Sequence, residues 1–402
     1  MTYSYTKNIS LPGLTIHFLR GHEPIEADNS FFSELYLSQQ GRAFLENFQS
    51  SRNQDQESKT LPKEQLEEKL ETVIRLKGED GLNALRDRAR KIAPLLKMES
   101  ELERLNKIIS ALLSTQPSKY LSSSIAKARA LGEPFDSGRI SLFEMLYEGL
   151  AGNSYPEYPE KNNTLKAYPN FGFLESYFSN YIEGTVFEVE EAKQIVLTET
   201  PLPARNEDSH DVLGTYKMVS NKAEMSTCPK TAEALIEILL YLHSIILSSR
   251  EDKNPGQFKD RNNRTGNTEF VDWQLVVGTL KKGYEWYSLL SHPFAKSAYI
   301  MFLISEVHPF IDGNGRITRL MMNAELSSQN FSKIIVPTVY TEDYMGALRK
   351  LTRQKDVKTY IRMLLRIYEF SATLFGEDID QMENYLKSCN AFMEPKRGKL
   401  HF

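Results

Sequence analysis

The chain has 402 residues, enough for two or three domains that each bury a core of their own. Charged residues make up 25% of it and the net charge is −4, which gives no reason to expect nucleic acid as a main partner. No apolar run approaches the ~20 residues needed to span a membrane, and residues 1–20 do not resemble a secretory signal. Cys228 and Cys389 lack metal-ligand spacing, so we expect free thiols, a reducing compartment and a cytoplasmic protein.

Residues 1–150 are predicted to form a mostly helical N-terminal region. Residues 14–19 alternate in polarity as a short strand does, and the apolar residues of 31–37 suggest a helix. Further along, apolar residues recur at helical spacing on both sides of a break at Gly78–Gly81, and a last helix is expected at 141–150.

A helix is predicted at about 171–184, inside a connector that spans residues 151–230. Ser179 and Glu183 stand four residues apart, hence on one face of this helix, and the glycine that follows is placed to end it in a left-handed conformation. A carboxylate at the C-terminal end of a helix is unfavourable unless a cation meets it. Arg319 is the candidate for that cation.

Residues 231–375 are predicted to form a core unit that carries the twelve-residue string described below. They begin with a strongly apolar helix at 232–247, in which His243 is best interpreted as a satisfied core histidine. The Gly- and Asn-rich segment 255–271 suits a short hairpin, although a plain surface loop remains open. Residues 376–402 contain one further helix and a basic tail.

The densest chemistry of the chain lies in twelve consecutive residues, His308-Pro309-Phe310-Ile311-Asp312-Gly313-Asn314-Gly315-Arg316-Ile317-Thr318-Arg319. The proline disfavours helical geometry at His308, so the imidazole should sit at a helix end. A second helix follows Gly315, and Arg316 and Arg319 project from it together, which favours an anion between them. The glycines would let phosphate oxygens approach the main chain. The spacing is that of neither a Walker loop nor a dinucleotide fingerprint.

This string matches every specified position of His-Pro-Phe-x-Asp/Glu-Gly-Asn-Gly-Arg-x-x-Arg and therefore resembles the signature of the Fic family. The Ser-x-x-x-Glu-Gly pattern that begins at Ser179 is similar to the family's inhibitory motif, and its N-terminal position resembles the intramolecular class of autoinhibited members. The resemblance implies a mainly α fold. We expect a Fic-type helical bundle with a small β-hairpin flap, preceded by an all-helical N-terminal region.

For function, the resemblance implies a protein adenylyltransferase, which transfers AMP from ATP to a Ser, Thr or Tyr hydroxyl of a protein target or of the chain itself. His308 would be the general base, and Asp312 would hold Mg²⁺ against the phosphates. Gly313, Asn314 and Gly315 would form the anion hole for the transferring phosphoryl group.

The resemblance assigns the remaining roles to residues around this hole. Arg316 would brace the leaving pyrophosphate, and Arg319 would grip the γ-phosphate. Tyr344 stands where family members place an aromatic side chain near the nucleotide, although simple packing remains open. Glu183, with Ser179 beside it, would inhibit the enzyme by pairing with Arg319.

Several alternatives remain open. Glu183 could instead position a water for removal of AMP, and another nucleotide or a phosphate could be the transferred group. Residues 351–354 lack the asparagine that often contacts the base in relatives, so the identity of the base is undetermined. A non-catalytic interaction protein is a further alternative, but His308 and Asn314 are both present. The target and the oligomeric state, including a homo-oligomer, stay open.

Overall fold

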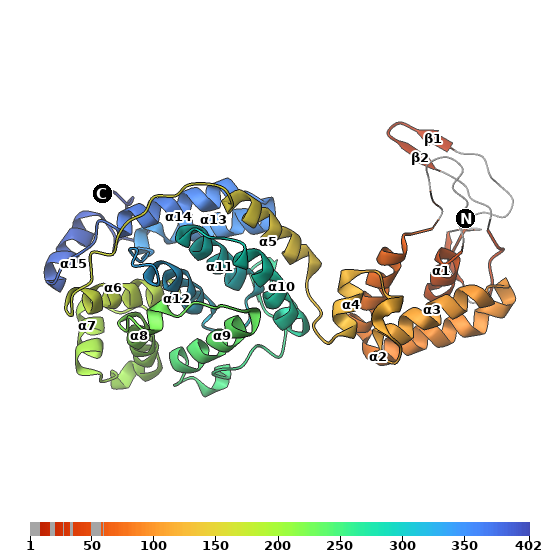
Figure 1. Cartoon of the computed structure of the whole chain (residues 1–402), viewed down its shortest axis with the longest axis horizontal. Coiled ribbons are helices and arrows are strands. Elements are labelled where there is room, and N and C mark those ends of the chain that lie inside the picture. Colours follow the sequence, from red (N-terminus) through yellow and green to blue (C-terminus); the bar gives the residue numbers. More distant parts are fainter. Residues whose placement is uncertain (1–8, 17–20, 27, 33–34, 50–57, 59) are drawn as a thin grey trace. The chain divides into compact units, whose positions relative to one another are not determined.

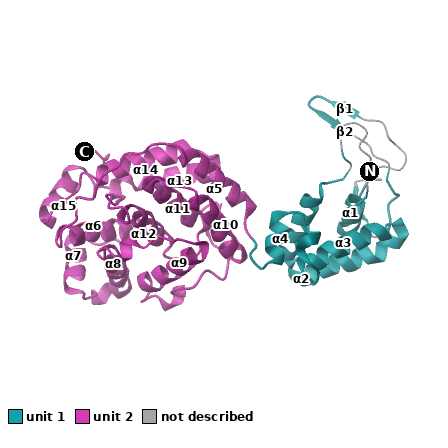
Figure 2. Ribbon diagram, in the orientation of Figure 1, with its two compact units in different colours: residues 1–134 teal, residues 135–402 magenta. Residues whose placement is uncertain are grey.

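The structure is a computed structural model that describes residues 9–16, 21–26, 28–32, 35–49, 58 and 60–402. The chain divides into two compact units, residues 1–134 and 135–402, which we describe separately (Figures 1 and 2). Helices dominate both units, and the strands among the described residues form small two-stranded antiparallel sheets. The expectation of a mainly α fold is therefore confirmed.

The first unit holds four helices among its described residues, whose apolar sides pack into one core. Its elements are β1 (Ile9–Leu11), β2 (Leu14–Ile16), β3 (Asn29–Phe32), β4 (Leu35–Leu37), α1 (Gln40–Asn47), α2 (Lys63–Leu96), α3 (Glu99–Leu112) and α4 (Ser124–Ala130). The predicted break is present as a kink inside α2, where Gly78 has a left-handed φ of 67°.

Two hairpins distinguish this unit from the all-helical region that we expected. β2 pairs with β1, and the rest of the predicted strand, residues 17–19, lies outside the described residues. The helix predicted over 31–37 is wrong, because β3 and β4 pair as an antiparallel hairpin there. An apolar run this short does not distinguish a helix from a strand by its periodicity.

The second unit carries the whole twelve-residue motif. Its helices and strands are α5 (Ser137–Leu150), α6 (Ala167–Ile182), α7 (Val189–Thr198), α8 (Asn206–Val219), α9 (Ala232–Ile246), β5 (Arg264–Thr265), β6 (Thr268–Glu269), α10 (Val276–Ser288), α11 (Pro293–Val307), α12 (Asn314–Ser327), α13 (Thr341–Gln354), α14 (Val357–Ser371) and α15 (Ile379–Ser388). The division of the chain differs from the sequence-based boundary at residue 150. α5 packs against α10 and α11, and Phe143 and Leu146 belong to their core.

Helix α11 is the centre of this unit. It is apolar on nearly all sides and lies among α5, α10 and α12, with which it packs (Figure 1). A helix that is hydrophobic all round is buried on all sides. α12 packs along α11 and also contacts α6 and α8. The loop between α11 and α12 is therefore held by the helices of the core around α11 and also by α6 and α8.

Two connecting segments complete the surroundings of that loop. The segment 186–231 contains two helices, α7 and α8, and α7 begins at a capping box formed by Glu188 and Glu191. The hairpin predicted within 255–271 is present as β5 and β6, in which Arg264 pairs with Glu269.

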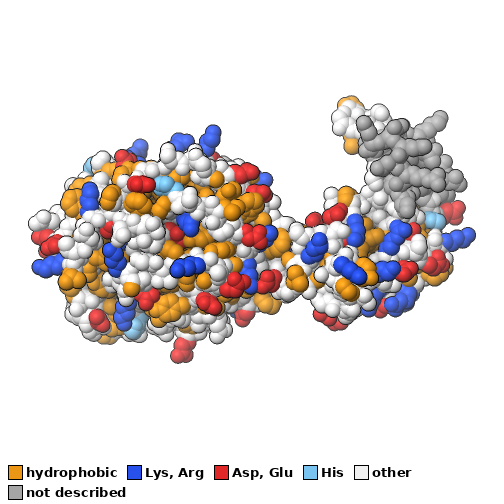
Figure 3. All heavy atoms as spheres, viewed as in Figure 1, with side chains coloured by type: hydrophobic (Ala, Val, Ile, Leu, Met, Phe, Trp, Pro, Cys, Tyr) orange, Lys and Arg blue, Asp and Glu red, His pale blue; other side chains and the backbone are white. Residues whose placement is uncertain are grey.

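The surface shows no concentration of one charge on the faces that Figure 3 presents, since acidic and basic side chains lie interspersed on each unit. Among the described residues, no helix combines the length and the apolar composition that crossing a bilayer requires. Cys228 and Cys389 are both unpaired, as expected.

Candidate active site

The motif forms a tight turn between α11 and α12. α11 ends at Val307, and His308 caps it in a left-handed conformation with a φ of 51°. α12 begins at Asn314, directly after Gly313, whose φ is 75°. The proline that follows His308 and the glycine that precedes α12 thus end one helix and start the next, which places the imidazole at a helix end as predicted.

The turn is braced from inside by Phe310 and Asn314. The Asn314 carboxamide accepts a hydrogen bond from the Phe310 N–H and donates one to the Phe310 carbonyl, both at 2.9 Å. The fully buried Phe310 ring stacks on the His243 ring, with centroids 3.9 Å apart. Because its side chain holds the turn, Asn314 can meet an anion through its backbone N–H.

His243 is a satisfied core histidine, as predicted, and it also supports the motif. Its Nδ1 accepts a hydrogen bond from the Gly256 N–H at 2.9 Å, and its Nε2 lies 3.3 Å from the Asp312 carbonyl oxygen. Burial, together with the nearby Arg316 cation, lowers the pKa of His243 to about 4. The ring is therefore neutral, with its proton on Nε2 donated to the motif backbone.

His308 lies beneath the segment that follows the flap. Its ring stacks on Phe270, directly after β6, with centroids 3.7 Å apart and planes within 6°. Burial lowers the pKa of His308 to about 3, and the neighbouring Lys259 ammonium contributes to the shift. A neutral imidazole can accept a proton, which is what a general base must do.

Lys259 and Asn263 tie the flap segment to the motif. The Lys259 backbone N–H donates to the Pro309 carbonyl at 2.9 Å, and its ammonium donates to the Asn263 side-chain oxygen at 2.8 Å. The Asn263 carboxamide in turn donates to the Phe310 carbonyl at 2.9 Å. Burial lowers the pKa of Lys259 to about 8. The backbone at the start of the turn is thus fixed from the flap segment.

Asp312 presents the accessible carboxylate of the site. One of its oxygens accepts the Gly313 N–H at 2.6 Å, and the side chain is 41% exposed. Among the described residues, no group of three or more His, Cys, Asp and Glu side chains could hold a metal ion. Mg²⁺ is commonly bound by one or two carboxylates together with substrate phosphates and water, so Asp312 alone fits that ion.

The two arginines of the motif face different helices. Arg316 is 2% exposed and lies 3.0 Å from a carboxylate oxygen of Asp211 on α8, yet its Nε and Nη1 make no hydrogen bond to the described part of the chain. Asp211 also binds Arg250, at 2.7 Å. The expectation that Arg316 and Arg319 share one anion therefore needs revision, because each already meets a carboxylate.

Arg319 is bound by the predicted inhibitory helix. Its Nη2 donates to a Glu183 carboxylate oxygen at 2.7 Å and to the Ser179 carbonyl at 2.8 Å, and its Nε donates to the Ser179 hydroxyl at 2.9 Å. Burial alone would lower the pKa of Arg319, but the Glu183 carboxylate and Tyr344 raise it. The contact that we expected at the end of this helix is present, and Gly184 ends the helix with a φ of 90°.

Gly315 lies directly against the Glu183 carboxylate. A Cβ at position 315 would overlap Oε1 and lie 2.7 Å from Cδ of Glu183. Glycine is thus required here for the close approach of a charged group. Tyr344, on α13, is 2% exposed and shares a hydrogen bond with Arg319, and burial raises its pKa. The structure brings Tyr344 to the guanidinium of Arg319.

Sequence reasoning missed the partners that arrive from other elements. Asp211, Lys259 and Asn263 were not among the predicted site residues. A signal existed for Asp211, which shares a buried face of α8 with Thr215 and Val219 at four-residue spacing. A carboxylate on a buried face needs a cationic partner, although the pattern does not identify it.

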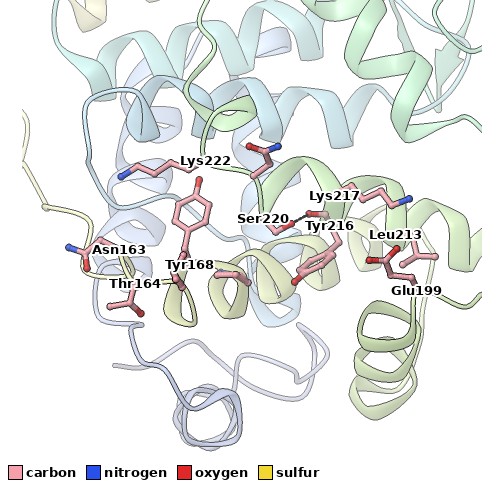
Figure 4. Close-up of a pocket in the computed structure, with 12 residues that line it drawn as sticks. Asn163, Thr164, Tyr168, Glu199, Leu213, Tyr216, Lys217, Ser220 and Lys222 are labelled. Carbon is pink, nitrogen blue, oxygen red and sulfur yellow. Dashed lines mark hydrogen bonds between the residues drawn. The ribbon is translucent and has the colours of Figure 1, made fainter.

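A separate pocket of about 730 Å³ lies between α6 and α8 (Figure 4). It is lined by the first turn of α6, including Tyr168, by the last turn of α8, including Lys217, and by Ser220 directly after α8. Glu183 follows the opposite end of α6, and no motif residue lines this pocket. The candidate active site is therefore distinct from it.

Together, the helical fold and this turn define a class of protein: one with an imidazole, a carboxylate and two arginines around a glycine-containing helix start. Residues 234–326, which include the motif, match the model of the Fic/DOC family. The chain is 25% identical to the protein adenylyltransferase Fic of Drosophila willistoni and to that of Drosophila melanogaster, in each case over 227 residues. These matches cover 54% of this chain and 44% of each relative, so the chain spans less than half of the curated relatives' length.

Solved structures also match. A Fic domain-containing signalling protein from Bacteroides thetaiotaomicron aligns with a TM-score of 0.45 and 19% identity over 61% of this chain and 97% of that one. Fic-1 from C. elegans aligns with a TM-score of 0.43 and 16% identity over 80% and 98%. The sequence matches thus show that the chain is similar, at low identity, to proteins named protein adenylyltransferase Fic, and that residues 234–326 match the Fic/DOC family model.

Proposed function

We propose that the chain is a protein adenylyltransferase that is inhibited by its own Glu183. The observation that carries the proposal is Arg316, a buried guanidinium whose Nη1 lies 3.0 Å from Asp211 and whose Nε makes no hydrogen bond to the described residues. It lies in the first turn of α12, where the backbone N–H groups have no partner one turn earlier. Such a helix start attracts phosphate groups.

The imidazole of His308 performs the proton transfer. It takes the proton of a target hydroxyl while the hydroxyl oxygen attacks the α-phosphorus of ATP. The bond from that phosphorus to the oxygen bridging to the β-phosphate breaks, and pyrophosphate leaves. A neutral imidazole is required for this step, and the lowered pKa of His308 supplies it.

The start of α12 stabilises the charge that develops on the phosphates. The N–H groups of Asn314 and Gly315 face the transferring group, because glycine at position 315 leaves the backbone accessible. Arg316 neutralises the leaving pyrophosphate. Asp312 would hold Mg²⁺, which when bound stabilises phosphate charge.

Glu183 inhibits the reaction by occupying the site of the γ-phosphate. Its carboxylate lies 2.7 Å from Arg319, the residue to which we assign that phosphate, and directly against Gly315. An anion already in this position excludes another one through charge and volume. ATP could then bind only in a geometry that is not in line for attack.

The flap positions the target. β5 and β6 form an exposed hairpin whose edge can pair with an extended segment of a protein, and Arg353 on α13 holds it by donating to the Thr268 hydroxyl at 2.6 Å. Phe270 covers His308 in this structure and moves aside when a target hydroxyl enters.

The test is incorporation of AMP into protein from ATP labelled at the α-phosphate, followed by mass spectrometry of the modified peptides. The Glu183→Gly variant should incorporate far more label than the natural chain, and adding His308→Ala should abolish it. His210→Ala, which alters a histidine outside the motif, is the matched control and should retain the activity. Label in the Glu183→Gly, His308→Ala protein would refute the assignment of the base.

A second candidate function is removal of AMP from a modified target. The position of Glu183 favours it, because the carboxylate lies beside Gly315 within the proposed anion hole, where it could orient a water. A modified target incubated with the natural chain should then lose AMP, while Glu183→Gly should leave it modified. In the incorporation assay described above, labelled UTP and GTP in place of labelled ATP determine which nucleotide the site prefers.

A further inference from the structure

Helix α6 contacts α12 along three successive turns, and only the last two of these contacts involve the proposed active site. Residues spaced four apart on α6 face residues spaced four apart on α12: Glu175 faces Asn323, Ser179 faces Arg319, and Glu183 faces Gly315. The first pair lies two turns from Glu183, about 12 Å along the helix. Its two side chains are buried and are not among the residues to which we assign the nucleotide.

The first turn of this contact contains an ion pair that the proposed reaction does not use. Lys333, in the segment after α12, is completely buried, and its ammonium lies 2.7 Å from the Glu175 carboxylate. It also donates to the Val219 carbonyl of α8 at 3.1 Å and lies over two aromatic rings of α6, those of Tyr168 at 4.5 Å and Phe171 at 5.2 Å. Three of these four partners belong to α6.

Lys333 is itself fixed to α12. The Asn323 carboxamide donates to the Ile334 carbonyl at 2.8 Å and accepts the Ile334 N–H at 2.7 Å. The same carboxamide donates to the other Glu175 oxygen at 2.8 Å. The cation that holds α6 is thus attached through the neighbouring residue to the helix that carries the motif.

A buried ion pair of this kind tolerates only one arrangement of the two helices. Taking a charge out of water costs several kcal/mol, which the partner charge offsets only at close range and in good geometry. If α6 slid or rotated by one residue, Glu175 and Lys333 would each become an uncompensated buried charge. The pair therefore favours the single register in which Glu183 reaches Arg319.

We propose that Glu175 and Lys333 are positioning residues for the inhibition: they set the register of α6 and thereby hold Glu183 on Arg319, without contacting substrate. This inference rests on the proposed function, since it assumes that Glu183 inhibits adenylylation. It also predicts that inhibition can be relieved from a place that is chemically separate from the active site. Loss of the ion pair should then raise activity, a result that damage to the fold does not produce.

The experiment measures AMP incorporation by four full-length proteins: the natural chain, Glu175→Gln, Glu183→Gly, and the double variant. Glutamine keeps the size of the side chain and removes its charge. In the natural background, Glu175→Gln should raise the rate about 5- to 150-fold, the range of a typical coupling between sites. In the Glu183→Gly background it should change nothing, because no inhibition is left to relieve.

The matched control is Glu383→Gln, which removes the carboxylate of another Glu–Lys pair, formed with Lys193 at 2.6 Å between α15 and α7. It should leave the rate unchanged. If Glu175→Gln does not fold, replacement of both Glu175 and Lys333 by methionine removes the pair without leaving a buried charge, and should raise the rate in the same way.

The outcomes separate this inference from the proposed function. If Glu183→Gly is active while folded Glu175→Gln stays at the natural rate, the positioning role is wrong and the function stands. An equal rise from Glu175→Gln in both backgrounds would also overturn it, because the effect would not pass through Glu183. If Glu183→Gly is itself inactive, the proposed function fails instead.

Discussion

The contact between Gly315 and Glu183 yields a prediction that depends on geometry alone. A methyl group at position 315 would overlap the Glu183 carboxylate, so Gly315→Ala should expel this carboxylate from Arg319. The lost hydrogen bond between charged groups contributes about 1.5–3 kcal/mol. Alanine in a helix offsets about 0.5–1 kcal/mol of this loss relative to glycine. The net destabilisation should be about 1–2 kcal/mol.

The effect of Gly315→Ala on the unfolding free energy should reverse its sign when the Glu183 carboxylate is absent. In a Glu183→Ala background the atoms that the new methyl group would strike are gone, and Gly315→Ala should stabilise the protein by about 0.5–1 kcal/mol. The two substitutions should therefore be coupled by about 2 kcal/mol.

Urea unfolding measures this coupling in the full chain. Both tryptophans, Trp273 and Trp286, lie in residues 135–402, so tryptophan fluorescence reports the unit that holds the site. If the unfolding free energy falls by about 3 kcal/mol per M of urea, Gly315→Ala should shift the unfolding midpoint differently in the two backgrounds. The shift in the natural background and the shift in the Glu183→Ala background should differ by about 0.7 M. Additivity within about 0.5 kcal/mol would refute the close approach of Glu183 to Gly315.

Two further predictions concern the histidines. Because burial lowers the pKa of His243 to about 4 and that of His308 to about 3, both stay neutral in the folded chain below pH 6.5, where the unfolded chain binds protons. The unfolding free energy should therefore fall as the pH drops from about 6.5 to about 4, by up to about 1.4 kcal/mol per pH unit for each ring. His243→Gln should reduce this pH dependence, which urea unfolding at several pH values measures. An unchanged pH dependence would contradict the lowered pKa of His243. Phe270→Ala should expose the His308 ring and raise its pKa toward 6.5, which NMR titration of the imidazole measures; a pKa that stays near 3 would show that Phe270 does not cause the burial.

The motif turn was predictable from the sequence because its causes are local. A proline after His308 determines where one helix ends, and the next helix begins within the same string, at Asn314 rather than after Gly315 as we predicted. The face shared by Ser179 and Glu183 followed from helical spacing, and the resemblance to the Fic family implied Arg319 as the partner of Glu183.

The partners supplied by distant elements could not be predicted in this way. Helical periodicity indicates that Asp211, Glu175 and Lys333 lie among apolar residues, but it does not show which buried charges meet. Those pairings depend on how α6, α8 and the segment after α12 pack in three dimensions. The hairpin of β3 and β4 was missed for a different reason, since a few apolar residues suit a helix and a strand equally well.

The central claim is that the site transfers AMP and is inhibited by Glu183. The most direct measurement compares label incorporated into protein by Glu183→Gly from ATP labelled at the α-phosphate with label incorporated from ATP labelled at the γ-phosphate. The account predicts strong incorporation from the α-label, little by the natural chain, and none from the γ-label. Incorporation of the γ-label would show that a phosphate is transferred, and absence of the α-label from the Glu183→Gly reaction would contradict the proposed function.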